Sequence, residues 1–307
     1  MYTRKTRKLK QKQYEMYLNY LKKQKGGRLE YINTFRSACS PEDASTKIKV
    51  IKTIKSPEEG DDYIHVLKSD HDVIVKIQEP GPLVISELKI HNHLLGSNNV
   101  INYICEFTCL LDISWNKPIE NPCYLCDNNG EVKHILVMEY INNDLANFLQ
   151  TNDYDNKVFE SLVKQAGFAL LDFHLNKGVC HNDINRGNIL LQIDNTVKEL
   201  TYKFYMKDHV VNTYGYEVIY IDFQRGYILG NDNNNNNSDT NNLLYPTNKF
   251  RPSRFSTARD ELTTLYHLMS IWTPRHSTRL KELTNAVFNS KNEDELVGCI
   301  SMFSTAA

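Results

Sequence analysis

The chain has 307 residues, of which 41% are hydrophobic and 24% are charged. This composition is ordinary for a globular protein and argues against a wholly disordered chain or a fibrous repeat. Because a single hydrophobic core stops growing at roughly 250–300 residues, the length favours two lobes that share one cleft. The net charge of −1 is the sum of two unlike parts.

The first of these parts is a basic N-terminal arm. Residues 1–28 contain ten Lys or Arg and one acidic residue, Glu15, so the remainder of the chain carries about −10. Apolar residues recur at helical spacing between Tyr14 and Leu21, which predicts an amphipathic helix docked on the first lobe. The alternatives for this arm are nuclear targeting and binding of nucleic acid or of an anionic surface such as a membrane.

No targeting or membrane segment stands out in the sequence. The residues after Met1 are rich in Lys and Arg and contain no apolar run, which argues against a secretory signal. No stretch approaches the roughly 20 apolar residues that span a bilayer. We therefore expect an intracellular protein, either cytoplasmic or nuclear.

The seven cysteines are too few for a disulfide scaffold, so free thiols are expected in a reducing compartment. One grouping offers zinc as an alternative, because two pairs of cysteines lie close together in the sequence. These are Cys105, Cys109, Cys123 and Cys126. The first pair has an unusual spacing for zinc, so free thiols are the favoured interpretation.

Hydrophobic patterning divides the chain into a β-rich first part and an α-rich second part. Three short β-type runs separated by polar turns predict an antiparallel meander over Lys47–Ile54, Tyr63–Lys68 and Val73–Gln78. A helix is predicted over Leu83–Leu95, ending at Gly96. The further predicted elements are strands at Val100–Leu111 and His134–Tyr140, helices after Asp144 and most clearly at Val158–Lys177, and an Asn-rich loop insertion at 231–242.

The stretch from Val179 to Leu191 has the pattern His-x-Asp-x-x-x-x-Asn followed by an apolar strand. Phosphoryl transfer needs a base to orient the attacking hydroxyl and oxygen ligands to hold Mg²⁺ on the phosphates. A carboxylate and an amide five residues apart on a short loop can face the same phosphate. This pattern predicts Asp183 as the catalytic base and Asn188 as a metal ligand.

Two further charged residues, Asp222 and Lys76, belong to or adjoin apolar strands. Asp222 ends the run Val218–Ile221, so it is placed to ligate metal. Lys76 lies inside an apolar strand, where an unpaired ammonium would be costly and an anionic partner is expected. Glu87 on the following helix can supply that partner.

These motifs resemble the protein-kinase-like superfamily, in the right order, from about Lys47 to Met269. The resemblance implies an α+β, bilobal fold with a small β-rich N-lobe and a mainly α-helical C-lobe, and ATP and Mg²⁺ as cofactors. The resemblance also implies that Lys76 pairs with Glu87 and contacts the α- and β-phosphates of ATP. Met138 stands where a gatekeeper residue sits.

The resemblance also implies the residues that would hold the nucleotide. Backbone groups of Glu139 and Ile141 would bind adenine, and Leu190 would line the nucleotide site. The loop that covers the phosphates has its counterpart in Ser56–Asp62, where Gly60 is accompanied by four carboxylates that would repel ATP. Nucleotide affinity is therefore expected to be weak.

The chain departs from protein kinases at two other positions. Gln224 stands where they usually have the glycine of Asp-Phe-Gly, so a backbone flip is less accessible. Asn185 replaces a lysine that touches the γ-phosphate, and Arg186 beside it is the candidate substitute. The sequence around Asp183 and Asn188 is similar to that of choline kinases, aminoglycoside phosphotransferases and haspin.

Two segments point back to protein substrates. Residues 253–266 resemble the start of a helix in casein kinase I and vaccinia-related kinases, in which an acid anchors the catalytic loop. Residues 213–216, together with the strand that ends at Asp222, resemble kinases encoded by large DNA viruses. They follow an insertion at Asn195–Tyr216.

The sequence as a whole predicts three regions: an arm at 1–28, a kinase N-lobe at 29–140 and a kinase C-lobe at 141–307. The favoured function is transfer of the γ-phosphate of ATP to serine or threonine hydroxyls of a protein substrate. The alternatives are a small-molecule kinase of the choline or aminoglycoside type and a pseudokinase that acts as a binding module.

Overall fold

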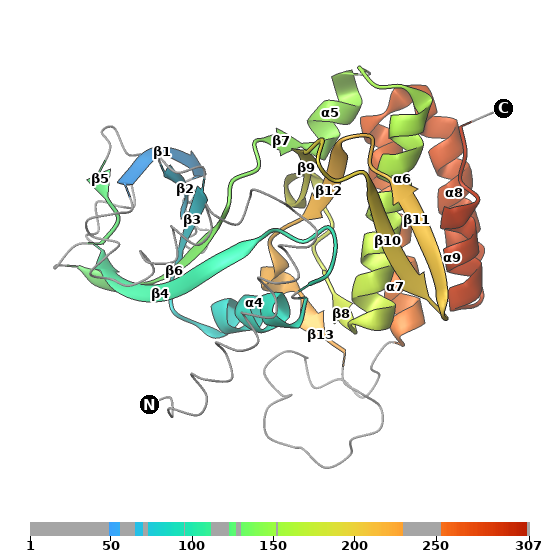
Figure 1. Ribbon diagram of the computed structural model, residues 1–307. Coiled ribbons are helices and arrows are strands. Elements are labelled where there is room, and N and C mark those ends of the chain that lie inside the picture. Colours follow the sequence, from blue (N-terminus) through green and yellow to red (C-terminus); the bar gives the residue numbers. More distant parts are fainter. Residues whose placement is uncertain are drawn as a thin grey trace, which may run out of the picture. The chain divides into compact units, whose positions relative to one another are not determined.

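A computed structural model describes most of the chain as two compact units (Figure 1). The described residues are 49–55, 65–69, 73–94, 96–111, 123–126, 130–151, 153–229 and 253–305. The first unit holds the described residues up to Val84 together with Ile101–Tyr140, and the second holds the remainder. The basic arm, the loop Ser56–Asp62 with Gly60 and the Asn-rich insertion lie outside the described residues.

The first unit is built on a six-stranded sheet with the order β4-β6-β3-β2-β1-β5, in which all the pairs are antiparallel. Its strands are β1 (Lys49–Lys55), β2 (His65–Ser69), β3 (Val73–Gln78), β4 (Tyr103–Leu111), β5 (Cys123–Tyr124) and β6 (Glu131–Glu139). The predicted meander is confirmed as β1-β2-β3. The predicted strands in the region of β4 and β6 are confirmed as well, with shifted ends.

Apolar residues of β3 and β6 explain why these strands lie in the middle of the sheet. Val75 pairs with Val137, and both side chains are fully buried. Lys76 pairs with Leu136, and its side chain is only 4% exposed. Burial of these β-branched side chains favours the extended backbone.

Three described cysteines of the first unit are disulfide-bonded, so the predicted free thiols are wrong at Cys105, Cys109 and Cys126. Cys109 is bonded to Cys126 with a Cα–Cα distance of 6.0 Å, and Cys105 is also in a disulfide. The zinc alternative is wrong too. Cys105 and Cys109 are four residues apart in a regular strand, which separates their Cα atoms by roughly 13 Å. One zinc ion with Zn–S bonds of about 2.3 Å cannot bind both.

The second unit combines helices with short sheets. Its helices are α4 (Pro82–His93, which begins in the first unit), α5 (Leu145–Thr151), α6 (Asn156–Leu171), the π-helix η2 (Asp172–Asn176), α7 (Arg254–Trp272), α8 (Ser277–Asn289) and α9 (Glu293–Ser301). Its strands are β7 (Asn143–Asp144), β8 (Val179–Cys180), β9 (Ile189–Ile193), β10 (Glu199–Phe204), β11 (Lys207–Asn212), β12 (Tyr216–Tyr220) and β13 (Tyr227–Ile228). The 3₁₀ turns are η3 (Arg186–Asn188), η4 (Phe223–Arg225) and η5 (Pro274–His276).

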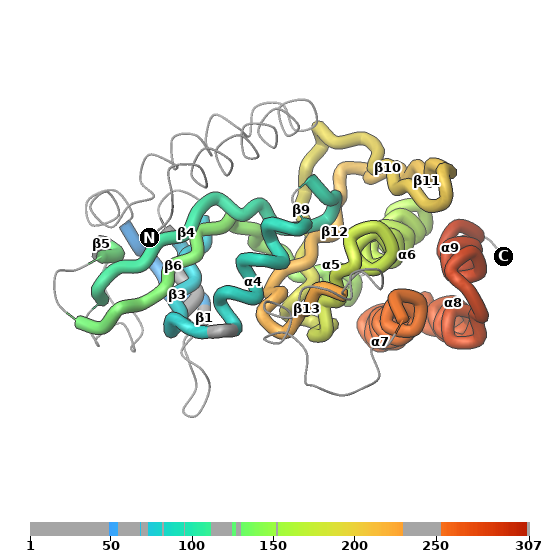
Figure 2. Tube along the Cα trace, turned by 90° about the horizontal axis from the view of Figure 1, so that it is seen from below, coloured from blue at the N-terminus to red at the C-terminus, as the bar shows by residue number. Residues whose placement is uncertain are grey.

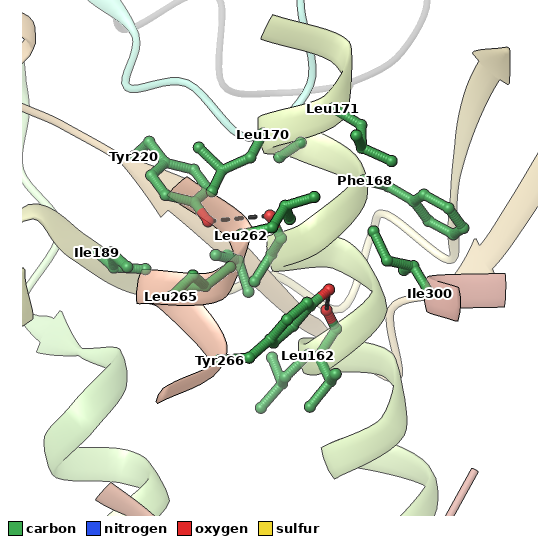
Figure 3. Close-up of a cluster of buried hydrophobic side chains, with 14 of the residues drawn as sticks. Leu162, Phe168, Leu170, Leu171, Ile189, Tyr220, Leu262, Leu265, Tyr266 and Ile300 are labelled. Carbon is green, nitrogen blue, oxygen red and sulfur yellow. Dashed lines mark hydrogen bonds between the residues drawn. The ribbon is translucent and has the colours of Figure 1, made fainter. Parts of the chain in front are cut away.

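Helix α6 is the centre of the second unit. Asp155 caps it by accepting a hydrogen bond from the Val158 amide at 2.8 Å, and its apolar face packs against α7, α9 and β12. Figure 2 shows α6, α7, α8 and α9 side by side and nearly end-on. In Figure 3, Tyr220 from β12 donates to the Ala166 carbonyl at 2.9 Å. The predicted long helix is confirmed, but its last turn is the π-helix.

The insertion before Asp222 forms the hairpin β10–β11, which lies against α6 (Figure 1). The rings of Phe168 and Tyr202 are 5.3 Å apart. Asn99, after α4, accepts from the Tyr202 hydroxyl at 2.6 Å and donates to the Val218 carbonyl at 2.7 Å. These bonds fix α4, the hairpin and β12 as one framework, so the end of β12 is held firmly.

The predicted fold class is confirmed. The first unit is a sheet, and the second is mainly helical, with short strands of which β9 and β12 carry the candidate site. Segregation of a sheet and helices in this way is typical of α+β architecture.

Candidate active site

Two predicted metal ligands lie at the same end of the neighbouring strands β9 and β12. Asn188 precedes β9 and Asp222 follows β12, and the strands pair antiparallel with Tyr220 opposite Ile189. The Ile221 amide donates to the Asn188 carbonyl at 3.1 Å. The antiparallel register therefore brings Asn188 and Asp222 together, although they are distant in the sequence.

The catalytic loop holds Asp183 and Asn188 against each other. The Asn188 amide nitrogen donates to the backbone carbonyl of Asp183 at 2.9 Å and to its carboxylate at 3.0 Å. Asn185 caps the turn η3 by accepting from the Gly187 amide at 2.8 Å, which fixes the loop between them. Because the side chain of Asn188 uses its nitrogen Nδ2 for Asp183, its side-chain oxygen Oδ1 is the atom that can face a cation.

The oxygen donors at this end of the strands fit Mg²⁺, which prefers carboxylate and carbonyl ligands. Asn188 would supply one oxygen and Asp222 a carboxylate. Asp222 has φ +61°, in the left-handed region that Asp tolerates better than most residues. The segment that follows is the 3₁₀ turn η4, and Gln224 is not in the left-handed region. Replacement of the usual glycine by Gln224 is therefore unstrained in this conformation.

His181 connects the catalytic loop to the metal-binding segment. Its Nε2 donates to the Ile221 carbonyl at 2.9 Å, and its ring lies 4.5 Å from that of Phe223. Phe223 in turn meets His91 of α4 edge-on at 5.6 Å. Complete burial lowers the pKa of His181, so the ring is neutral and acts as a fixed donor.

Glu261 of α7 anchors the catalytic loop through hydrogen bonds to its carboxylate. Its carboxylate accepts from the backbone amide of His181 at 3.3 Å, from that of Asn182, from the Cys180 thiol at 3.1 Å and from His174 Nε2 at 2.8 Å. Burial by itself would raise the pKa of Glu261, but His174 and these donors outweigh it and lower the pKa to about 2. The carboxylate is therefore ionised, and it orients the two residues before Asp183.

Three of these side chains also form the one group of metal-type ligands found among the described residues. They are His174, Cys180 and Glu261, whose ligand atoms lie within 4.8 Å of one another. Each of these atoms already takes part in a hydrogen bond, and Thr257 completes the set by meeting His174 Nδ1 at 3.2 Å. Burial raises the pKa of the Cys180 thiol, which favours its protonated form. Hydrogen bonding thus accounts for the cluster.

Arg186, predicted to act near the phosphate, is held by the region of α5. Its guanidinium donates to Asn147 and, at 3.3 Å, to Gln150, and its Nε lies 3.7 Å from the Asp144 carboxylate. These contacts fasten the catalytic loop to the start of α5. Its role in catalysis stays a prediction.

The other predicted residues are divided between the units. Lys76, Met138 and Glu139 belong to the first unit, and Glu87 and Ile141 to the second. Glu87 is fully buried and lies 3.8 Å from His91 Nε2. The ion pair of Lys76 with Glu87 stays a prediction, as do the adenine contacts.

Two further residues, Leu190 and Gly60, are predicted to bind the nucleotide. Leu190 lies in β9, opposite Ile219 of β12, and Gly60 is outside the described residues. The sequence predicts an acid near the start of α7 but does not single out Glu261. Ser253, Thr257 and Glu261 recur every four residues, which places them on one face of a helix. That spacing could have distinguished buried Glu261 from exposed Asp260.

A fold of this kind, with an anchored catalytic loop beside two metal-ligand candidates, defines a kinase-like protein. Comparison with family models gives a more particular similarity, because residues 122–248 match the lipopolysaccharide kinase (Kdo/WaaP) family. The match covers about two fifths of the chain and includes Asp183, Asn188 and Asp222. No curated protein matches the chain. Among the described helices, none has the length and apolar character needed to cross a membrane.

Proposed function

We propose that the chain is an ATP- and Mg²⁺-dependent protein kinase that phosphorylates serine or threonine hydroxyls. The observation that carries the proposal is the contact of Asn188 with Asp183 at the strand end where Asp222 also stands. A base and oxygen ligands on a rigid loop are the parts that phosphoryl transfer requires. The match to a kinase family over this segment supports the same chemistry.

In this reaction Asp183 orients the acceptor hydroxyl and takes its proton. The hydroxyl oxygen forms a bond to the γ-phosphorus while the bond to the β-phosphate oxygen breaks, which leaves ADP. Asn188 and Asp222 would hold Mg²⁺, which supplies neutralising charge on the phosphates. Lys76, supported by Glu87, would contact the α- and β-phosphates.

A sugar hydroxyl is the second candidate for the acceptor. The specific observation in its favour is the match to the lipopolysaccharide kinase family. The first candidate is favoured by residues 253–266, which resemble protein kinases and form the N-terminal part of α7. Both candidates use the same Asp183 chemistry, so the acceptor alone separates them.

The proposal is tested by transfer of labelled γ-phosphate from ATP with Mg²⁺ to casein, histone, myelin basic protein and lipopolysaccharide. We expect label on serine or threonine that disappears in Asp183→Asn and persists in Asp208→Asn, an exposed aspartate on the hairpin. Label on lipopolysaccharide alone would support the second candidate. No transfer to any acceptor would contradict both candidates and favour a binding module.

A further inference from the structure

Arg225 stands beside the catalytic loop. It is the last residue of η4, three positions after Asp222, and its backbone carbonyl accepts a hydrogen bond from the Asn182 side chain at 3.1 Å. Asn182 directly precedes Asp183. The position of Arg225 is therefore coupled to the residue that would act as the base.

The backbone on either side of Arg225 is fixed. The Gly226 amide donates to the Phe223 carbonyl at 2.9 Å, and the Gly226 carbonyl accepts from the Ser86 hydroxyl at 3.3 Å. A Cβ at Gly226 would lie 2.8 Å from the Cys180 carbonyl, so the chain passes tightly against β8. The Arg225 side chain therefore projects from a backbone that is held in place on both sides.

The guanidinium of Arg225 differs from those of the other arginines in the part of the chain that the structure describes. Each of the others meets a side chain or a carbonyl, namely Arg186 with Asn147, Arg254 with Leu175, Arg259 with Asp260, Arg275 with Asn156 and Arg279 with Glu282. Arg225 is exposed, and its guanidinium has no hydrogen bond or ion pair with any described residue. No described residue therefore takes up its charge.

Exposed arginines are commonly solvated, and Arg225 is distinguished from them by its location beside the catalytic loop. Guanidinium binds carboxylate or phosphate through two parallel hydrogen bonds, and it is preorganised for them when its backbone is fixed. Next to a base that receives an acceptor hydroxyl, such a group can bind an anion carried by the acceptor. We propose that Arg225 binds an acidic side chain near the target serine or threonine, so that the substrates are acidic peptides.

This inference rests on the proposed protein kinase activity and is tested with two short serine peptides. In one peptide the serine is flanked by aspartates, and in the other by asparagines. We expect Arg225→Gln to raise KM for the acidic peptide by about ten-fold, the size of one charge-assisted contact, with kcat and KM for ATP unchanged. KM for the neutral peptide stays the same. Arg225→Lys should raise KM for the acidic peptide by a smaller factor, and Arg279→Gln on α8 should leave this KM unchanged.

A binding experiment keeps the inference separate from the proposed function. Anisotropy of the labelled peptides, with alanine in place of serine, needs no catalysis. Tighter binding of the acidic peptide by wild type, lost in Arg225→Gln, supports the inference even if transfer fails. Equal binding of both peptides, or an equal loss for both in Arg225→Gln, overturns it. Displacement of the acidic peptide by glucuronate, with no peptide phosphorylated, would overturn the peptide assignment in favour of a sugar.

Discussion

At the scale of single residues, the charge of Glu261 decides how the catalytic loop is held. The carboxylate is buried, yet it accepts from two backbone amides, one thiol and one imidazole. A buried charge is tolerated only when it is fully hydrogen-bonded, and here the donors come from the loop itself. Loss of the carboxyl group would leave the amides of His181 and Asn182 without their acceptor.

We predict that Glu261→Gln lowers the free energy of unfolding at pH 7 by about 3 kcal/mol, the value of a pKa lowered to about 2. A lowered pKa stabilises the fold fully above about pH 4.5 and loses this effect as the pH falls toward 2. The difference between wild type and variant should therefore shrink over this range. Urea titrations at several pH values measure it, with exposed Glu282→Gln as control. A difference that does not change with pH would contradict the account.

We predict that Cys180 is unreactive in the folded protein. Burial and the neighbouring Glu261 carboxylate raise the pKa of its thiol, so little thiolate is present at pH 8. Cys299, which is only partly buried, should react with iodoacetamide about ten-fold faster or more. Peptide mapping by mass spectrometry separates the two sites. Equal labelling rates before unfolding would show that β8 is not buried as described.

At the scale of elements, close packing of α6 and α7 positions the helix that carries Glu261. Gly167 of α6 lies where a Cβ would meet the Tyr266 hydroxyl of α7 and would stand 2.9 Å from Ile300 of α9. Tyr266 is fully buried in the cluster of Figure 3. The glycine therefore allows the two helices to approach, at the expense of intrinsic helix propensity.

We predict that Gly167→Ala destabilises the protein by about 1–3 kcal/mol, despite alanine's higher helix propensity, because the methyl group overpacks this contact. Tyr266→Phe removes the hydroxyl that the methyl would meet. In that background the same change should cost less, which a double-mutant cycle by chemical denaturation would detect as coupling. Additive effects would mean that the methyl finds room elsewhere.

In the first unit, the disulfide of Cys109 with Cys126 ties β4 to the segment after β5. It spans 17 residues, and constraint of the unfolded chain by a loop of this size contributes about 3 kcal/mol. We predict that joint replacement of both cysteines by serine lowers stability by about this amount, and that Cys299→Ser changes it little. Dithiothreitol should lower the stability of wild type at least to that of the double variant. Wild type that is unaffected by the reductant would argue against the bond.

At the scale of the whole molecule, the sequence predicts what is encoded locally. The catalytic loop is recognisable because Asp183 and Asn188 lie five residues apart and contact each other within one turn. The strand that carries Asp222 is an apolar run with an acid at its end. Periodicity likewise predicts α6, because its buried face is continuous in the sequence.

The features that the sequence does not reveal depend on contacts between distant segments. Glu261 meets the catalytic loop 80 residues away, so its partners cannot be found from the local sequence, and only its four-residue spacing from Thr257 separates it from Asp260. The bond from Cys109 to Cys126 is hidden because pairing cannot be deduced from spacing alone. That the guanidinium of Arg225 meets no described residue emerges only when the partners of the other described arginines are known.

The most direct test of the central claim is single-turnover transfer of γ-phosphate from ATP to a serine peptide, with Mg²⁺, by wild type and by Asp183→Asn. We predict that the variant still binds ATP but transfers phosphate about 10²- to 10⁴-fold more slowly, as expected for loss of a positioned base. Chelation of Mg²⁺ should abolish transfer by wild type. Unchanged transfer by Asp183→Asn would contradict the assignment of Asp183 as the catalytic base.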